Sequence, residues 1–267
     1  MWGSADFLGG LASRRAAAVS VVLVVQGIGM ILALGAAGLR GEGIPEPRAI
    51  ALAVGAGIGA GIGLLGLYHG LAVGRMGVVA PVTGVLAAAL PVVVGMVRDG
   101  LPGGSIIVGI ALALLAVVIV SRVPGVDSGR SGFEFGIIAG LGLASFNILV
   151  GVLPGEGVFA PLVALKGASA ILIVGVILAR RVSWTMPRAA LPLAIGAAVL
   201  DLLGNAFYLL ATQAGRLDVA VTLSSLYPVT TVILAAVVLR ERVTRDHGMG
   251  IVAAGAAIVL IASGSAG

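Results

Sequence analysis

Four charged or titratable side chains lie inside long apolar segments of this sequence: Asp6, His69, Lys166 and Asp201. If these segments cross a membrane, a charge at the bilayer centre costs at least about 2.5–3.5 kcal/mol, so each such residue should face a protein interior and have a role. Carboxylates, an amine and an imidazole can bind protons, cations or the charged groups of a solute.

Asp201 begins a polar stripe in the segment 189–215. Asn205, Tyr208 and Thr212 follow it at spacings of 4, 3 and 4 residues. At about 100° per residue, the four side chains fall within a band of roughly 60° on one face of a helix. We interpret the stripe as a wall of a solute cavity, with Asp201 as a proton or cation site. The alternative is a structural ion pair or hydrogen-bond network.

Lys166 lies in the middle of another apolar segment, 157–179. It could form a structural ion pair with Asp201 or bind an anionic group of a solute, and both possibilities stay open. The position that matches Lys166 in the first half of the chain is the neutral Gln26. The two halves are therefore expected to line the cavity with different chemistry.

Two further places could contribute to the cavity. Tyr68 falls near the polar stripe when the two halves of the chain are overlaid. His69, beside it, could titrate near neutral pH, although a histidine near a helix end is more often an interfacial residue. Trp2, Ser4 and Asp6 at the N-terminus could line the cavity or lie among the lipid headgroups.

Composition identifies the solvent around these segments. Hydrophobic residues make up 60% of the 267 residues and charged residues only 10%, against about 25% in soluble domains. So few charges could not cover a water-facing surface, and lipid is the solvent that fits. Nine apolar stretches approach the length of a spanning helix, which is about 20 residues. A tenth, residues 2–12, is short, as if its first turn were missing. The sequence therefore predicts an all-α membrane protein with ten transmembrane helices.

The two halves of the chain repeat each other. Gly74-Arg75 recurs as Gly215-Arg216, and Gly109-Ile110 recurs as Gly250-Ile251, with the same offset between the members of each pair. Several landmarks in the same order at nearly one offset indicate an internal duplication. Further pairs at almost the same offset are Gln26-Gly27 with Lys166-Gly167, Pro47-Arg48 with Pro187-Arg188, and Arg98-Asp99 with Arg240-Glu241.

We predict a first five-helix repeat over residues 1–121, a polar linker over 122–133 and a second five-helix repeat over 134–264. Because five is odd, the second repeat must enter the membrane from the opposite side. Inverted repeats of this kind are typical of secondary transporters, whose solute site lies near the midplane where the repeats meet. The ten spans are expected at residues 2–13, 16–39, 48–73, 77–97, 102–121, 134–153, 158–180, 188–214, 218–239 and 246–264.

Motifs at both ends of the chain resemble one family. The chain opens with Trp2-Gly3-Ser4-Ala5-Asp6-Phe7, and Leu226-Tyr227-Pro228 precedes Arg240-Glu241-Arg242-Val243-Thr244. These motifs resemble those of the EamA family in the drug/metabolite transporter superfamily. The resemblance covers nearly the whole chain and implies two five-helix repeats and a transport function, without indicating a substrate. The first repeat departs from the pattern at Leu86 and Asp99, which stand where the second repeat has proline and glutamate.

Glycines in the third predicted span have a packing role. Gly61–Gly66 matches the dinucleotide-binding pattern GxGxxG, but no strand precedes it and the next acidic residue is Asp99, so we reject that interpretation. Gly55, Gly59 and Gly63 instead form a GxxxGxxxG seam, which lets two membrane helices approach closely.

Several function classes lack their residues. The sequence has no GxxxxGK[ST] motif, no HExxH motif, two histidines and no cysteine, so we expect neither a cofactor nor a metal. A membrane-embedded enzyme would need a nucleophile with its base or a metal cluster. The net charge of +5 comes from arginines scattered between the spans, which argues against nucleic acid as a partner.

We expect a secondary transporter that exports a small metabolite or drug-like solute by alternating access, with proton coupling or exchange. The alternatives are a non-transporting membrane scaffold or assembly subunit and, with less support, a membrane-embedded enzyme. The expected partners are a small solute and the lipid bilayer, with the chain as a monomer or a homodimer. Fifteen arginines against one lysine indicate a GC-rich bacterial genome and hence the bacterial inner membrane.

The arginines also bear on orientation. Eleven lie in the loops on one predicted side of the membrane and four in the loops on the other. The positive-inside rule therefore places both termini outside. The family resemblance implies that both termini are inside, and the two orientations stay open.

Overall fold

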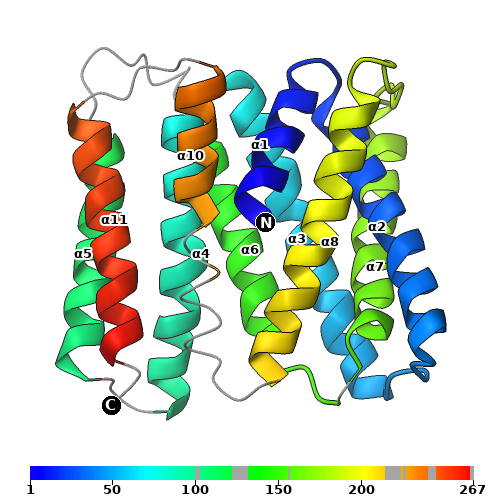
Figure 1. The fold of residues 1–267 in the computed structure, drawn as a ribbon, viewed down its shortest axis with the longest axis horizontal. Helices are drawn as coiled ribbons and strands as arrows, with labels where there is room; N and C mark the ends of the chain where they lie inside the picture. Colours follow the sequence, from blue (N-terminus) through cyan, green and yellow to red (C-terminus); the bar gives the residue numbers. More distant parts are fainter. Residues whose placement is uncertain are drawn as a thin grey trace.

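The chain folds into a bundle in which each described helix runs in the opposite direction to the described helix before it (Figure 1). The computed structural model describes residues 1–99, 103–121, 132–155, 157–213, 224, 227–239 and 245–264. These residues contain no strand. Their helices are α1 (Trp2–Ser13), α2 (Ala18–Arg40), α3 (Pro47–Val73), α4 (Met76–Asp99), α5 (Gly104–Ser121), α6 (Phe133–Gly151), α7 (Phe159–Arg180), α8 (Leu191–Gln213), α10 (Tyr227–Val238) and α11 (Arg245–Gly264).

The helix bounds agree with the spans expected from the sequence. Nine of the described helices begin and end within three residues of their predicted spans. Of the ninth span, 218–239, the described part is α10 with residues 224 and 239, and most of the predicted linker 122–133 lies outside the described residues. By length and composition, α2, α3, α6, α7 and α8 could each cross a membrane. The all-α prediction is confirmed for the described residues, and the ten-span inverted topology stays a prediction.

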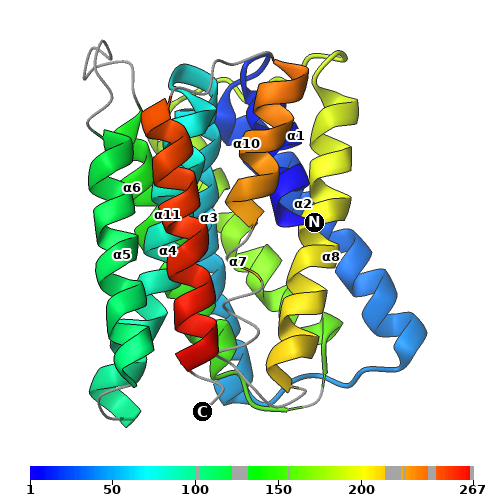
Figure 2. The same cartoon turned by 60° about the vertical axis from the view of Figure 1, so that its left-hand side comes forward.

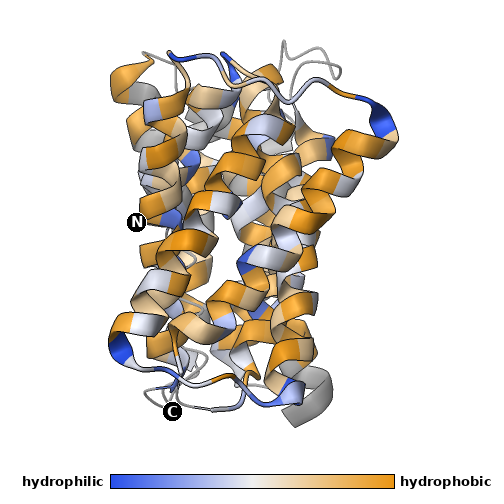
Figure 3. Cartoon of the chain, turned by 90° about the vertical axis from the view of Figure 1, so that its right-hand side faces the viewer, coloured by the Kyte–Doolittle hydropathy of each residue, from blue (hydrophilic) through white to orange (hydrophobic). Residues whose placement is uncertain are grey.

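The outer surface of the bundle is apolar. On α2 and α7, Ile31, Ile171 and Leu178 are exposed to 65%, 75% and 71%. Figure 3 shows hydrophobic residues along the outside of the helices and hydrophilic residues concentrated at the two ends. An apolar surface this extensive is far larger than the patches that soluble proteins expose, and it fits contact with lipid tails.

The glycine seam of α3 packs against α6. A Cβ atom on Gly59 would lie 2.9 Å from the carbonyl oxygen of Gly142, and one on Gly63 would lie 2.9 Å from the backbone nitrogen of Leu143. A Cβ on Gly55 would meet Leu149 at 3.1 Å. These distances leave no room for larger residues at Gly59 and Gly63, so the close-packing role predicted for the seam is confirmed.

The helix contacts occur in corresponding pairs. By position within their halves of the chain, α1, α2, α3 and α4 correspond to α6, α7, α8 and α10. The α3–α6 contact then corresponds to α8–α1, the α4–α6 contact to α10–α1, and the α3–α7 contact to α8–α2. Figure 2 shows α10 beside α1. In addition, α2 packs on α7, α4 on α10 and α5 on α11. Helices from the two halves of the chain are thus interleaved within one bundle.

A carboxylate from the first half of the chain caps α7 in the second half. Oε2 of Glu42, in the α2–α3 loop, accepts hydrogen bonds from the backbone N–H groups of Val158, Phe159 and Ala160 at 3.1, 2.8 and 2.8 Å. The first N–H groups of a helix have no partner within it, and a negative charge there also interacts favourably with the helix dipole. Glu42 therefore ties the two halves together at one end of the bundle.

Candidate functional site

A cavity is lined in part by Trp2 and Asp6 in the first turns of α1. This helix begins near mid-height of the bundle (Figure 1). The cavity encloses about 440 Å³ between protein atoms, including its opening. Seven helices contribute to its wall, so no single segment of the sequence encodes it. The lining residues are Trp2 and Asp6 from α1, Gln26 from α2, Ala60 and Leu64 from α3, Ala87 from α4, Leu143, Phe146 and Asn147 from α6, Asp201 and Asn205 from α8, and Tyr227 from α10.

A buried ion pair supports one wall of this cavity. Lys166 of α7 has no exposed surface and pairs with Asp201 of α8. The Lys166 Nζ also donates to Gln26 Oε1 at 3.0 Å, and Gln26 Nε2 donates to Ser169 Oγ at 2.8 Å. A buried ammonium is tolerated when it is paired and its protons are bonded. The structure thus contains the ion pair that the sequence left as one of two possibilities, and Lys166 stands behind the cavity wall.

Trp2 of α1 forms a neighbouring part of the wall. Its indole Nε1 donates to Asn205 Oδ1 at 2.8 Å, which joins α1 to α8. The ring lies with its centroid 5.9 Å from Phe146, 5.4 Å from Tyr208 and 6.1 Å from Tyr227, in edge-on or tilted arrangements. Such arrangements are favourable because the positive edge of one ring meets the negative face of another.

A glycine of α8 makes room for this indole. A Cβ atom at Gly204 would overlap the Trp2 ring. Gly204 precedes Asn205, which accepts the hydrogen bond from Trp2. The absence of a side chain at Gly204 therefore lets α1 approach α8 where this hydrogen bond forms. Close approach places Trp2 against the polar stripe, at the centre of the bundle.

The predicted stripe divides between the cavity and its surroundings. Asp201 and Asn205 line the cavity. Tyr208 is buried one layer behind, where its hydroxyl donates to the carbonyl oxygen of Asn147 at 3.2 Å. The Thr212 hydroxyl donates at 2.8 Å to the carbonyl of Leu209 in its own helix, a common arrangement for threonine in helices.

Two candidate residues on α3 do not line the cavity. Tyr68 is fully buried against Gly9 of α1, where a Cβ would overlap its ring, and its hydroxyl has no hydrogen-bond partner in the described part of the chain. His69 is exposed and lies edge-on to Phe135, with 4.6 Å between the ring centroids. Neither residue is among those that line the cavity, and a role for Tyr68 in transport stays a prediction.

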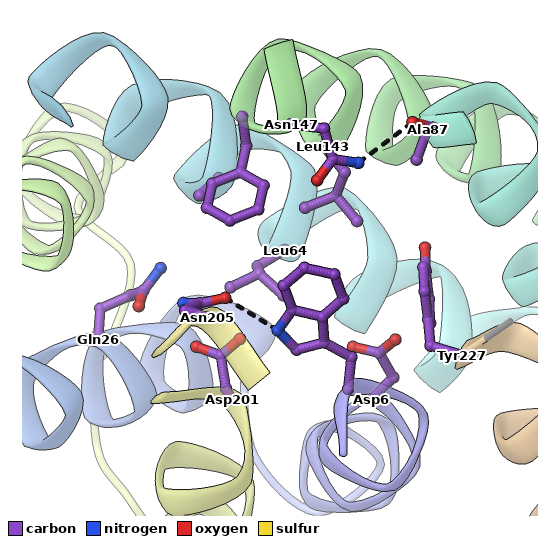
Figure 4. Close-up of a pocket in the computed structure, with 12 residues that line it drawn as sticks. Asp6, Gln26, Leu64, Ala87, Leu143, Asn147, Asp201, Asn205 and Tyr227 are labelled. Carbon is purple, nitrogen blue, oxygen red and sulfur yellow. Dashed lines mark hydrogen bonds between the residues drawn. The ribbon is translucent and has the colours of Figure 1, made fainter. Parts of the chain in front are cut away.

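Asp6 is a cavity residue whose carboxylate has no partner among the described residues. It is 5% exposed, and it makes no hydrogen bond or ion pair with any described residue. Figure 4 shows its carboxylate in the cavity with Asp201 and Tyr227. Across the cavity, Asn147 Nδ2 donates to the carbonyl of Ala87 at 3.1 Å. The Asn147 Oδ1 and the Tyr227 hydroxyl lack partners in the described residues.

Apart from Trp2, the apolar and aromatic residues of the wall were not predicted from the sequence. A signal for some of them was present, because Leu64 corresponds to Asn205, and Trp2 to Leu143, when the two predicted repeats are overlaid. This overlay of the two halves of the chain places Leu64 at the position of the predicted Asn205 and Leu143 at the position of Trp2, so both leucines could have been predicted. Phe146 and Tyr227 gave no such signal. Among the described residues, no three histidine or carboxylate side chains lie close enough to hold a metal ion.

Comparison with known proteins assigns the chain to a family. Residues 131–263 match the EamA-like transporter family. One solved protein crystal structure aligns with a TM-score of 0.65 and 18% identity over 97% of this chain and 94% of its own, which shows a shared fold. No curated protein matches the chain. The chain is therefore a multi-pass membrane protein that belongs to the EamA-like transporter family.

Proposed function

We propose that this protein is a secondary transporter that carries a small solute through the central cavity by alternating access. In this proposal the chain has ten transmembrane helices in two inverted repeats, residues 1–121 and 134–264. The alternating helix directions support it, because α1 and α6 then begin their repeats in opposite directions (Figure 1). The helix contacts support it too, since each of the three paired contacts is kept when the first repeat is exchanged for the second.

The composition of the cavity wall carries the proposal. Four pairs of lining residues occupy corresponding positions of the two repeats, since the members of each pair are separated by the same offset as Gly74 and Gly215. A cavity built from matching positions of both repeats lies where the repeats meet, as solute sites of inverted-repeat transporters do. The pairs are Trp2 with Leu143, Asp6 with Asn147, Ala60 with Asp201, and Leu64 with Asn205.

The roles of the wall residues follow from their partners. Asp201, held by Lys166, and the unpaired Asp6 are the carboxylates through which transport would be coupled to protons or to an exchanged ion. Gln26 and Asn205 supply amide groups at the wall. Tyr208 supports Trp2 from behind. We further propose that the solute is a metabolite or drug-like molecule, and that the protein exports it across a bacterial inner membrane.

Blocking the cavity should stop transport. Ala60 and Ala51 both lie on α3, but Ala60 lines the cavity and Ala51 is exposed on the outer surface. We expect Ala60→Leu to reduce solute flux into proteoliposomes to the level of protein-free liposomes, because leucine would fill the cavity. A metabolite comparison of cells with and without the gene would supply the solute for this assay.

The control for this experiment is Ala51→Leu, which adds the same atoms where they meet lipid. It should keep the saturable flux of the unaltered protein and its response to an imposed pH or solute gradient. Equal flux through the Ala60→Leu and unaltered proteins would remove the cavity from the transport path. Absence of saturable flux for every solute found in cells would contradict transport altogether.

A further inference from the structure

We propose that the cavity binds an organic ammonium ion, with the Asp6 carboxylate as its counter-charge and the aromatic rings of Trp2, Phe146 and Tyr227 as its apolar wall. This inference rests on the proposed function in so far as the same cavity is the transport site. It adds the chemical class of the solute.

The charges around the cavity do not balance. Asp6 and Asp201 are both buried at its wall, and Lys166 neutralises Asp201 through their ion pair. The exposed N-terminal amine of Met1 attracts Asp6 through space but forms no ion pair with it in the described chain. Among the described residues, one buried carboxylate at the cavity therefore has no counter-ion, and a bound cation would supply it.

Much of the free hydrogen-bonding capacity is also of the acceptor kind, although the Tyr227 hydroxyl, which has no partner in the described residues, can donate as well as accept. The side-chain nitrogens of Trp2, Gln26, Asn147 and Lys166 already donate to protein acceptors. The Asp6 carboxylate and Asn147 Oδ1 have no donor among the described residues. Buried polar atoms are nearly always hydrogen-bonded, so these acceptors call for a ligand that brings N–H groups.

The aromatic wall favours an organic cation over a metal ion. Trp2, Phe146 and Tyr227 bring three rings to the cavity, and the ring of Tyr208 stands behind them. Ring faces attract ammonium groups, and apolar rings also pack against the hydrocarbon part of an amine. A calcium or magnesium ion would instead need about six oxygen ligands. The described residues offer no cluster of that kind.

A series of ligands that differ in charge tests this inference. The probes are 2-phenylethylamine, which is protonated at neutral pH, the neutral 2-phenylethanol and the anionic 3-phenylpropionate. The chain has two tryptophans, Trp2 in the cavity and Trp184, which is 65% exposed. Trp184→Phe therefore leaves Trp2 as the sole tryptophan reporter in purified protein. We expect saturable quenching or shift of its fluorescence by the amine, at concentrations at least about tenfold below those needed for the other two probes.

Variants of Asp6 then locate the counter-charge. Asp6→Asn should weaken amine binding by roughly 30-fold or more, the usual cost of removing one partner of a buried charge pair. Asp6→Glu should restore most of it. Glu46→Gln is the matched control, because it removes a negative charge from an exposed residue of the α2–α3 loop and should leave binding unchanged.

Two results would overturn the inference: equal affinity for the three probes, or amine affinity in Asp6→Asn equal to that of the parent. If the Asp6→Asn protein elutes as an aggregate in gel filtration, the comparison of the three probes and the amine affinity of Asp6→Glu still test the inference. Flux measurements separate this inference from the proposed function. Transport of other solutes without amine binding would reject the ammonium site alone, and amine binding without any flux would reject transport alone.

Discussion

Asp201→Asn is expected to lower the free energy of unfolding by about 3–5 kcal/mol, because it leaves the ammonium of Lys166 buried without its counter-charge. Lys166 has no exposed surface, so water cannot replace the lost carboxylate without rearrangement of α2, α7 and α8. The remaining partner of the Lys166 ammonium is Oε1 of the Gln26 side chain, which carries no charge. Denaturant titration of the purified protein in detergent measures the change.

The double variant Lys166→Met/Asp201→Leu separates the ion pair from the packing around it. Replacing both partners by apolar residues of similar size is often nearly neutral, whereas removing one partner is costly. We therefore expect the double variant to recover most of the stability lost in Asp201→Asn. Losses that simply add in the double variant would mean that the two residues stabilise the fold independently, contrary to the observed ion pair.

Gly142→Ala is expected to destabilise the protein by about 2–3 kcal/mol, at the upper end of the range for overpacked cores. A Cβ atom at Gly142 would lie 2.7 Å from the carbonyl oxygen of Gly59 and 2.5 Å from the backbone nitrogen of Gly63. Backbone atoms cannot rotate away as side-chain ends can, so α3 and α6 would have to separate. Thermal unfolding in detergent, followed by loss of the monodisperse peak, measures the effect.

Gly27→Ala provides the matched control. Gly27 also lies within a helix, α2, but a Cβ atom there would meet nothing within 4 Å. We expect this change to be neutral or to stabilise by roughly 0.5–1 kcal/mol, since alanine restricts the unfolded chain more than glycine does. Similar losses in both variants would show that helix composition, and not the α3–α6 contact, sets the cost.

The helices could be located from the sequence because lipid makes the hydropathy signal unusually direct. A helix in lipid must be apolar over its whole length, so its bounds are visible without knowledge of its neighbours. The glycine seam was recognisable for a similar reason, since its residues share one face of one helix. Asp201 and Asn205 could be found because helical periodicity places them together.

The rest of the site depends on contacts between distant segments. The aromatic cluster combines residues from α1, α6, α8 and α10, and no local pattern connects Trp2 with Tyr227. Thr212 satisfied the helical spacing but turns its hydroxyl to its own backbone. Tyr68 falls close to Tyr208 when the repeats are overlaid, yet it packs into the space left by Gly9.

The depth of α1 was the least predictable feature. Its short sequence allowed Asp6 to lie either among lipid headgroups or in the cavity. The helix begins at half the height of the bundle, so its first residues reach the centre (Figure 1). The space beside Gly204 admits the indole of Trp2, and this contact holds Asp6 at the cavity wall.

The central claim is that the cavity is reached in turn from each side of the membrane. The chain has no cysteine, so Leu64→Cys places a single thiol at the cavity wall, and Ile31→Cys places one on the outer surface for comparison. A charged, membrane-impermeant thiol reagent is added to either face of proteoliposomes of uniform orientation. We predict that the thiol at position 64 reacts from both faces and is protected by transported solute, while the one at position 31, which lies against lipid tails, does not react from either face. Reaction at position 64 from one face only, or from neither, would contradict alternating access through this cavity.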